Sequence, residues 1–384
     1  MPNRIPFNRP FLVGTEFERM RDAVAGLRIS EGGPFTEQCE SILEHITGAG
    51  AALMTSSCTH ALEIAALLLG VRPGDEVILP SFTFVSTANA FALRGARPVF
   101  ADVCPDTLNI DPASVAQLLT HRTRAVIAVH YAGVACDMDA LSAVLADAGI
   151  PLIEDNAQGL LGTYKGKPLG SFGVLATQSF HETKNLSCGK GGALLVNDES
   201  LLRRARIIRT KGTNRDEFFE GLVDKYSWVD LGSSYLPSDL LSAFLLCQLE
   251  EREQIQARRR KIWNRYFQEL TPWAESEGVR LPVVPDYAEH PSHLFHLVMP
   301  SAADRRNLMR DLERDGVHAV FHYVPLHSSA MGYSFGADPL SCPVTEDVSQ
   351  RLLRLPFYTG MTDDDQTRVI AGVQAHACLR HAAV

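Results

Sequence analysis

Residues 124–157, RAVIAVHYAGVACDMDALSAVLADAGIPLIEDNA, contain one strand–helix–strand pattern. The runs at 124–131 and 150–157 are short, rich in β-branched residues and apolar on both faces, which predicts two buried strands. The segment 138–149 between them is apolar at helical spacing and ends at a glycine, which predicts a helix. Two such strands joined through a helix predict a parallel pair in a sheet that helices cover on both sides.

The same alternation continues along the chain and predicts an α/β fold. Further strands are expected at EVILP (76–80), RPVFADV (97–103), ATQSF (176–180) and GGALLVN (191–197). A single helix that could bridge two domains is expected over 238–270, opened by a Ser–Asp cap. Beyond it we expect a loop at 281–291, strands at 293–299 and 318–323, and helices at 304–315, 344–355 and 363–377. These patterns predict a large domain at 1–250 and a small α+β C-terminal domain at 251–384.

The composition fits a globular protein of two domains, with 384 residues, 46% hydrophobic and 21% charged. The net charge of -9 argues against a nucleic acid as the main partner, because phosphate binding needs a basic face. The eight cysteines are scattered without a CxxC pair, so we expect no metal site and a reducing compartment. We find neither a signal-peptide core nor an apolar run of membrane-span length, and expect a cytoplasmic protein with no membrane partner.

Three polar groups follow the ends of predicted strands, where ligands gather in open parallel sheets. Asp155 closes the strand PLIED, and Lys184 follows the strand TQSF in a polar turn. The third group is the turn TSSCTHAL (55–62), in which Ser56 to Thr59 run directly into a helix. Its hydroxyls, free N–H donors and positive dipole end suit a phosphate.

A lysine, a strand-end aspartate and a phosphate site together fit pyridoxal phosphate. The aldehyde of this cofactor needs a lysine amine, and its pyridine nitrogen needs a carboxylate to stay protonated. Each feature alone has a simpler explanation: an aspartate that caps a turn, a solvated loop lysine, and a helix cap. Their combination on one edge of the sheet favours the cofactor.

Five blocks of the sequence resemble the DegT-type sugar-nucleotide aminotransferases, which are fold-type-I pyridoxal phosphate enzymes. The blocks are SCTHAL (57–62), PSFTFVSTANAFALRGARPVFADV (80–103), VHYAG (129–133), EDNAQ (154–158) and SFHETKN (179–185). The resemblance covers essentially the whole chain and implies a large domain with a mostly parallel sheet and a smaller C-terminal domain. The blocks KGTNR (211–215) and FHYVPLH (321–327) resemble members that use glutamate to aminate C4 of dTDP-4-keto-6-deoxyglucose, giving dTDP-4-amino-4,6-dideoxygalactose.

The resemblance assigns residues to the cofactor. It implies that Lys184 forms the Schiff base and acts as general acid/base, while Asp155 pairs with the pyridine nitrogen. Gln158 would lie against the ring near its hydroxyl. Phe84 would stack on the ring, although it is also one apolar residue among many in its segment. The phosphate would be held by Thr59, Ser179 and the backbone around Cys58 and His60.

The resemblance also implies substrate contacts, each with a structural role as the alternative. The residues concerned are His181, Lys211, Arg215, Tyr323 and His327. Lys211 and Arg215 would bind the nucleotide diphosphate, with surface solvation as the alternative. His181 would face the cofactor or fill its turn, and His327 would meet the sugar or diphosphate or be a structural histidine.

The fold type implies a homodimer with a shared active site. The segment 224–239, DKYSWVDLGSSYLPSD, is aromatic with little charge, which is typical of an interface core. The alternative is that Tyr226, Trp228 and Tyr235 pack inside their own subunit. The sequence departs from the family at Leu236, where many members have an Asn or Arg that reaches the neighbouring subunit's phosphate. That contact would come from backbone, or from Ser233 or Ser234.

Other functions fit less well. Within the family, amination at C3 or of a UDP-linked sugar stays open, whereas dehydratase relatives have a histidine in place of Lys184. A non-catalytic regulator that binds pyridoxal phosphate would need a DNA-binding module, for which we find no spare segment. A nicotinamide dehydrogenase would need GxGxxG after the first strand, and the glycines of GKGG lack that spacing.

Overall fold

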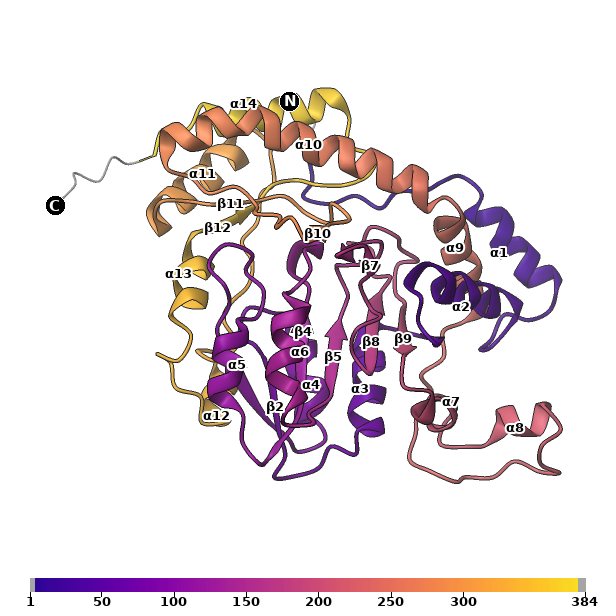
Figure 1. Cartoon of the computed structure of the whole chain (residues 1–384). Helices are drawn as coiled ribbons and strands as arrows, with labels where there is room; N and C mark the ends of the chain where they lie inside the picture. Colours follow the sequence, from indigo (N-terminus) through magenta and orange to yellow (C-terminus); the bar gives the residue numbers. More distant parts are fainter. Residues whose placement is uncertain (1–3, 379–384) are drawn as a thin grey trace.

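The structure, a computed structural model, describes residues 4–378, and its centre is a seven-stranded sheet (Figure 1). The strands lie in the order β1-β9-β8-β5-β4-β2-β3. Their bounds are β1 (Ala51–Thr55), β2 (Glu76–Pro80), β3 (Arg97–Ala101), β4 (Thr123–Val129), β5 (Leu152–Asp155), β8 (Leu175–Ser179) and β9 (Gly192–Val196). All neighbouring pairs from β8 to β3 are parallel, which confirms the predicted α/β sheet.

Strand β9 is the exception, because it runs antiparallel to both β8 and β1. Only residues 180–191 connect β8 to β9, without a crossover helix, so β9 turns back beside β8. Strand β1 is missing from our sequence predictions. The run AALMT is short and buried, and it forms a strand because it pairs with β9.

Helices cover both faces of the sheet. Along β2, Val77 and Leu79 face one hydrophobic layer and Ile78 faces the other, as expected for a strand buried on both sides. The first layer contains α3 (Cys58–Leu68), α4 (Val85–Ala92) and α7 (Leu202–Arg209). The second contains α2 (Pro34–Thr47), α5 (Pro112–Leu118), α6 (Met138–Ala146) and α9 (Asp239–Glu250).

The long helix predicted over 238–270 is two helices, so that prediction was wrong. Ser238 caps α9 as expected, its side chain accepting from the amide of Leu240. The chain then leaves helical geometry at Glu251 and resumes as α10 (Arg252–Glu277), which crosses the top of the molecule (Figure 1). The break lets α9 pack beside α1 (Glu16–Ala25) and α2, whereas most of α10 packs on the C-terminal core.

The C-terminal part has its own hydrophobic cluster, formed by α10, α11 (Ala302–Arg314), α14 (Asp363–Gln374) and the antiparallel pair β11 (His296–Val298) and β12 (Leu352–Arg354). Ile5, from the other end of the chain, also packs there. The predicted strand at 318–323 is not a strand, because only Val320 makes an isolated bridge, to Arg354. The helix α13 (Pro343–Arg351) is shorter than the helix predicted at 344–355, because the chain continues as strand β12 from Leu352. The division at residue 250 stays a prediction.

The remaining elements are short. They are α8 (Arg215–Phe219), α12 (Ala330–Ser334), the three-residue 3-10 turns Tyr131–Gly133 and Glu199–Leu201, and a small sheet of β6 (Thr163–Tyr164), β7 (Lys167–Pro168) and β10 (Ala288–Glu289). Strand β10 lies in the segment 281–291 that we predicted to be a loop. In residues 4–378, none of the helices has the length and apolar character needed to cross a membrane.

Candidate active site

A cavity of about 810 Å³ lies at the carboxyl ends of the parallel strands. Val129, Asp155 and Ser179, at the ends of β4, β5 and β8, form part of one wall. The other wall comes from the C-terminal part of the chain, including His293, residues 320–324 and Arg354. The cavity is therefore where a ligand is expected to bind in an open parallel sheet.

Most of the residues predicted for the site line this cavity. They are Cys58, Thr59, His60, Phe84, Asp155, Gln158, Ser179, His181, Lys184 and Tyr323. Three other predicted residues, Lys211, Arg215 and His327, do not line it.

Lys184 lies in the turn between β8 and β9. Hydrogen bonds shape this turn: Phe180 N–H donates to the carbonyl of Gly191 (2.9 Å), and Lys184 N–H to the carbonyl of His181 (2.9 Å). Burial lowers the pKa of the Lys184 amine, and the positive charge of Arg354 adds to this, whereas the charge of Asp155 opposes it. A lysine with a lowered pKa provides more of the neutral amine, which is the form that attacks a carbonyl group.

Asp155 points into the cavity from the end of β5. Its Oδ2 accepts a hydrogen bond from Thr87 Oγ1 (2.8 Å), and its Oδ1 accepts one from the amide of Ala157 (3.2 Å). Burial raises the pKa of Asp155, while these two hydrogen bonds and the charge of Lys184 work against that rise. A buried carboxylate whose charged form is supported by such contacts stabilises a proton on a neighbouring ring nitrogen.

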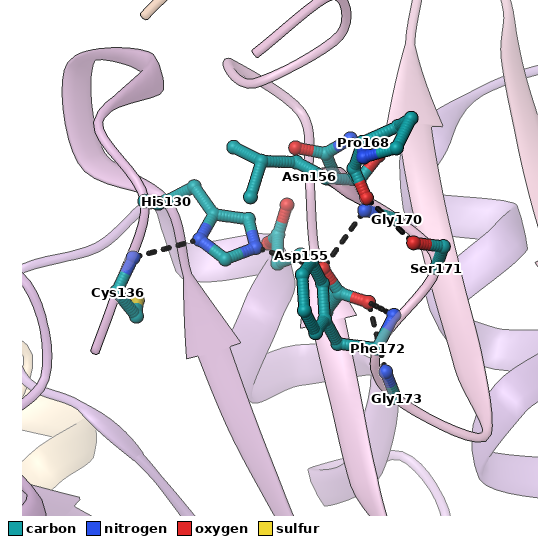
Figure 2. Close-up of polar contacts among 12 residues, drawn as sticks. His130, Cys136, Asp155, Asn156, Pro168, Gly170, Ser171, Phe172 and Gly173 are labelled. Atoms are coloured by element: carbon teal, nitrogen blue, oxygen red, sulfur yellow. Dashed lines mark hydrogen bonds and ion pairs between the residues drawn. The ribbon is translucent and has the colours of Figure 1, made fainter. Parts of the chain in front are cut away.

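Glu154, the preceding residue, is fully buried, and the alternation of side chains along β5 directs it to the face opposite Asp155. It anchors β5 through a hydrogen-bond network whose other members include His130, Cys136 and Gly170 (Figure 2). His130 Nδ1 accepts from the amide of Cys136 (3.1 Å), so its Nε2 carries the hydrogen that is donated to Glu154 (3.0 Å). Burial alone would raise the pKa of Glu154, but these hydrogen bonds lower it. Backbone amides also donate to the carboxylate, from Gly170 (2.8 Å), Phe172 (2.7 Å) and Gly173 (2.8 Å).

The start of α3 forms an open anion site. Ser57 caps the helix by accepting from His60 N–H (3.2 Å), and within residues 4–378 the amides of Cys58 and Thr59 have no acceptor. The Oγ1 of Thr59 points to Ser86 Oγ (2.9 Å). Gly192 packs so tightly under this turn that an added Cβ would lie 2.3 Å from the nitrogen of Cys58. The free amides and hydroxyls fit the phosphate of pyridoxal phosphate.

The middle of the cavity fits an aromatic ring. Phe84 is 57% exposed, whereas its neighbour Phe82 is 1% exposed, so an apolar ring face is left for a ligand to cover. Gln158 Oε1 accepts from the amide of Ala132 (2.8 Å), and its Nε2 donates to Tyr323 Oη (3.2 Å). Phe84, Asp155 and Lys184 therefore offer a stacking surface, a carboxylate and an amine, as this cofactor requires.

The three residues outside the cavity have other partners. Lys211 and Arg215 both pair with Glu31, and Arg215 also stacks on Phe219. His327 is fully buried, and its Nδ1 bonds the Ser81 hydroxyl (2.6 Å), which is the structural role given above as its alternative. Their substrate contacts stay predictions.

His181 and Ser179 face the cavity with few contacts of their own. The imidazole of His181 is exposed, and among residues 4–378 it bonds only the side chain and amide of Thr183, within its own turn. Beside Leu236, Ser234 Oγ donates to Glu31 (3.3 Å), while the carbonyl of Ser233 accepts from Lys211 N–H.

Sequence reasoning missed several residues of the cavity. Thr87, which binds Asp155, lies in the block that contained Phe84, so a hydroxyl one helical turn further on was the available signal. Arg354 and His293 come from the C-terminal part. Arg354 lies in the block RLLRLPFY (351–358), where an arginine within an apolar strand was the only signal.

Away from the cavity, Asp304, His376 and Cys378 bring possible metal-ligand atoms within 4.8 Å of one another. Asp304 accepts from Ser301 Oγ (2.6 Å), and His376 Nδ1 lies 3.0 Å from Asp311 Oδ2. These protein contacts account for two of the three side chains.

The chain is similar to known proteins along nearly its whole length. The sequence profile of the DegT/DnrJ/EryC1/StrS aminotransferase family matches residues 12–374. The spore coat polysaccharide biosynthesis protein SpsC of Bacillus subtilis (strain 168) is 33% identical over 378 residues, covering 96% of each chain. The aminotransferase TlmJ from Streptoalloteichus hindustanus superposes with a TM-score of 0.89 at 33% identity, covering 97% of this chain and 98% of TlmJ. The PLP form of the putative sugar aminotransferase Spr1654 from Streptococcus pneumoniae has a TM-score of 0.90 at 26% identity, covering 97% and 98%.

Proposed function

Since the chain belongs to the DegT/DnrJ/EryC1/StrS aminotransferase family, we propose that it transfers the amino group of glutamate to C4 of dTDP-4-keto-6-deoxyglucose, forming dTDP-4-amino-4,6-dideoxygalactose. The coarser statement is that the chain is a sugar aminotransferase that uses pyridoxal 5′-phosphate. The observation that carries the proposal is that Lys184 and Asp155 share one cavity with the open start of α3. The finer substrate is supported by the block FHYVPLH, because its residues Phe321, His322 and Tyr323 line that cavity.

The cofactor would be held at three points. The amides of Cys58 and Thr59, with the hydroxyls of Thr59 and Ser179, would bind its phosphate. Phe84 would cover one face of its ring, and Asp155 would hold a proton at its ring nitrogen. When bound, pyridoxal phosphate supplies an aldehyde that accepts the amino group and a ring that takes up the electron pair left on the neighbouring carbon.

Lys184 would move the protons. Its Nζ takes a proton from Cα of glutamate in the first half-reaction and delivers one to C4 of the sugar in the second. The lowered pKa of Lys184 suits this role, because a lysine at its ordinary value of about 10.4 has almost no free amine at neutral pH. Walls that exclude water, such as Phe357 and Leu294, would keep the reacting atoms from hydrolysis.

We also propose that two copies share the site. The segment around α8 extends away from the body of the subunit (Figure 1) and carries exposed apolar side chains. Trp228 is 77% exposed and Tyr226 52%, whereas Tyr235 is buried in its own subunit against His60. The alternative of packing inside one subunit thus describes Tyr235 alone. A second copy that covers this segment would bury its apolar surface.

The cytoplasm is the compartment we propose for the reaction. All eight cysteines are free thiols, and six of them are buried, which fits a reducing environment.

The decisive experiment is an assay of the purified protein with glutamate and a panel of dTDP- and UDP-linked keto sugars, with the product identified by NMR. A 4-amino product formed only from the dTDP-linked 4-keto sugar supports the proposal. Amination at C3, or of a UDP sugar, would replace the substrate but keep the enzyme class. Cofactor binding without turnover of any sugar would favour the non-catalytic regulator.

Lys184→Ala tests the central residue. We expect the fold to persist and turnover to fall by several orders of magnitude, because the covalent and proton-transfer group is lost. The visible absorption of lysine-bound cofactor should disappear as well. Lys190→Ala, which removes another lysine of the same cavity, is the matched control. Wild-type turnover in Lys184→Ala would contradict the assignment.

A further inference from the structure

Arg354, the last residue of β12, brings an unpaired positive charge to the cavity wall. Within residues 4–378 no Asp or Glu pairs with its guanidinium, and its buried Nε has no hydrogen-bond partner. Its one hydrogen bond runs from Nη2 to the carbonyl of Phe321 (3.3 Å). A buried charged donor without a partner is costly, so an unpaired guanidinium beside a ligand cavity indicates an anionic ligand.

The guanidinium is held in place before any ligand binds. The backbone of Arg354 exchanges two hydrogen bonds with Val320, of 2.7 and 3.1 Å, and pairs with His296 of β11. The ring of Phe7 lies 4.6 Å from Cζ, which fixes the guanidinium plane. Since its position is fixed, little entropy is lost when it binds a ligand.

Arg354 and Lys184 act on the same region of the cavity. Asn185, the residue after Lys184, bonds His293 Nδ1 (2.9 Å) and so joins the lysine turn to the C-terminal wall. Burial lowers the pKa of His293, and the charges of both Lys184 and Arg354 lower it further. The anion bound by Arg354 should therefore lie close to the nitrogen that is transferred.

Three anions could enter this cavity, and their positions differ. The cofactor phosphate has its site at the start of α3, on the sheet side. The diphosphate of a sugar nucleotide is separated from C4 by the sugar ring. The α-carboxylate of an amino acid is attached directly to the carbon that carries the transferred nitrogen, so it alone must lie near Lys184.

We propose that Arg354 binds the α-carboxylate of the amino donor, and of the 2-oxo acid that leaves, through paired N–H···O hydrogen bonds. This inference rests on the proposed function. The planar guanidinium matches a carboxylate in shape and charge, and Nε is available for one of the two bonds. Arg354 would thus select an amino acid as donor, while the opposite wall holds the cofactor.

The first test measures binding without turnover. The enzyme carrying pyridoxal phosphate cannot convert 2-oxoglutarate, which has no amino group to transfer, so calorimetry gives a dissociation constant. We expect Arg354→Gln to weaken this binding by about 10- to 100-fold, as for loss of a charged hydrogen-bonded pair. Arg354→Lys should lose less affinity for 2-oxoglutarate, and it replaces the Gln variant in this test if the Gln variant fails to fold. Lys190→Gln removes another charge of the same cavity, and its dissociation constant for 2-oxoglutarate should stay within about twofold of the wild-type value.

The second test compares donors and half-reactions. Wild type should prefer glutamate over L-isoglutamine, whose α-carboxylate is an amide, and Arg354→Gln should lose most of that preference. Amination of the keto sugar by the pyridoxamine form should change little. Unchanged 2-oxoglutarate binding, an equal loss in Lys190→Gln, or a loss confined to the sugar half-reaction would overturn the inference. If wild type accepts no amino donor, the proposed function itself fails, whatever the Arg354 variants do.

Discussion

Asp155 is buried, yet it has a hydroxyl, an amide and a nearby amine that favour its charged form. Asp155→Asn keeps the shape and can still accept from Thr87 but removes the charge. We expect kcat to fall by about 100-fold, because a neutral amide cannot hold a proton on the ring nitrogen. Cofactor affinity should fall far less, since the phosphate site is intact. Absorption titration and steady-state kinetics measure the two effects, and equal activity in Asp155→Asn would remove Asp155 from the mechanism.

The same variant has a pH signature in the cofactor-free protein. Burial raises the pKa of Asp155, so the folded state keeps a proton over a pH range in which the unfolded state has lost it. Stability from Asp155 is then complete below its unfolded pKa of about 3.9 and is lost as pH rises through the folded pKa. The stability of Asp155→Asn relative to wild type should therefore increase with pH across that window. Thermal unfolding at a series of pH values tests this, and a constant difference would contradict it.

Residues within contiguous motifs at strand ends could be predicted from the sequence. Lys184 and Asp155 are such residues, because the carboxyl ends of neighbouring parallel strands meet whatever the details of packing. Thr87 could not be predicted, since it meets Asp155 across 68 residues and only the docking of α4 on the sheet brings them together. Arg354 depends on the packing of the C-terminal part over the sheet, for which the local pattern contains no information.

At the scale of elements, Glu154 anchors β5 through the hydrogen bonds of its side chain. In Glu154→Gln, an amide group would face backbone N–H donors and His130, leaving at least one buried donor unpaired (Figure 2). Leaving a buried hydrogen-bond donor unpaired costs about 1–3 kcal/mol, so the melting temperature should fall. Because the pKa of Glu154 is lowered, its stabilisation is present above the unfolded value of about 4.3 and is lost as pH falls. The difference in melting temperature should narrow toward acid, and a difference that widens there would contradict this account.

The close packing of β9 under α3 gives a second prediction at this scale. Gly192→Ala would place a Cβ 2.3 Å from both the nitrogen of Cys58 and the carbonyl carbon of Ser57, so the turn must move. We expect the affinity for pyridoxal phosphate to fall by about tenfold or more, because small displacements of a binding group are costly. Gly26→Ala is the control, since its nearest contact would be 3.4 Å. Unchanged affinity in Gly192→Ala would show that this turn does not hold the phosphate.

Most strands of the central sheet could be predicted, but not how the elements continue or turn. The apolar runs of β2, β4 and β5 are buried on both faces, so their composition alone identifies them. Strand β1 was not predicted, because its identity depends on pairing with β9, 137 residues or more away in the register. The break at Glu251 is flanked by glutamate and arginine residues, which do not break helices by propensity. It arises because α9 and α10 pack into two different hydrophobic cores.

At the scale of the whole molecule, the proposed dimer depends on the exposed aromatic segment 224–239. We expect light scattering to give a mass near twice the 42.1 kDa chain. Trp228→Glu should shift the protein toward monomer, because a charge at the centre of an apolar interface is unfavourable, while the fold of each subunit persists since Trp228 is 77% exposed. Cofactor retention should fall together with the mass, and both should recover at higher protein concentration.

The control is Leu340→Glu, which places the same charge on a residue that is 83% exposed, in the loop between α12 and α13 at the opposite side of the subunit from α8 (Figure 1). If dimerisation and cofactor binding are linked, the fraction of bound cofactor should follow the fraction of dimer. Dilution of wild type and substitution of Trp228 should then fall on one curve of bound cofactor against dimer fraction. Leu340→Glu should lie with wild type on that curve. A monomeric Trp228→Glu that keeps its cofactor and transaminates at the full rate would mean that each subunit contains a complete site.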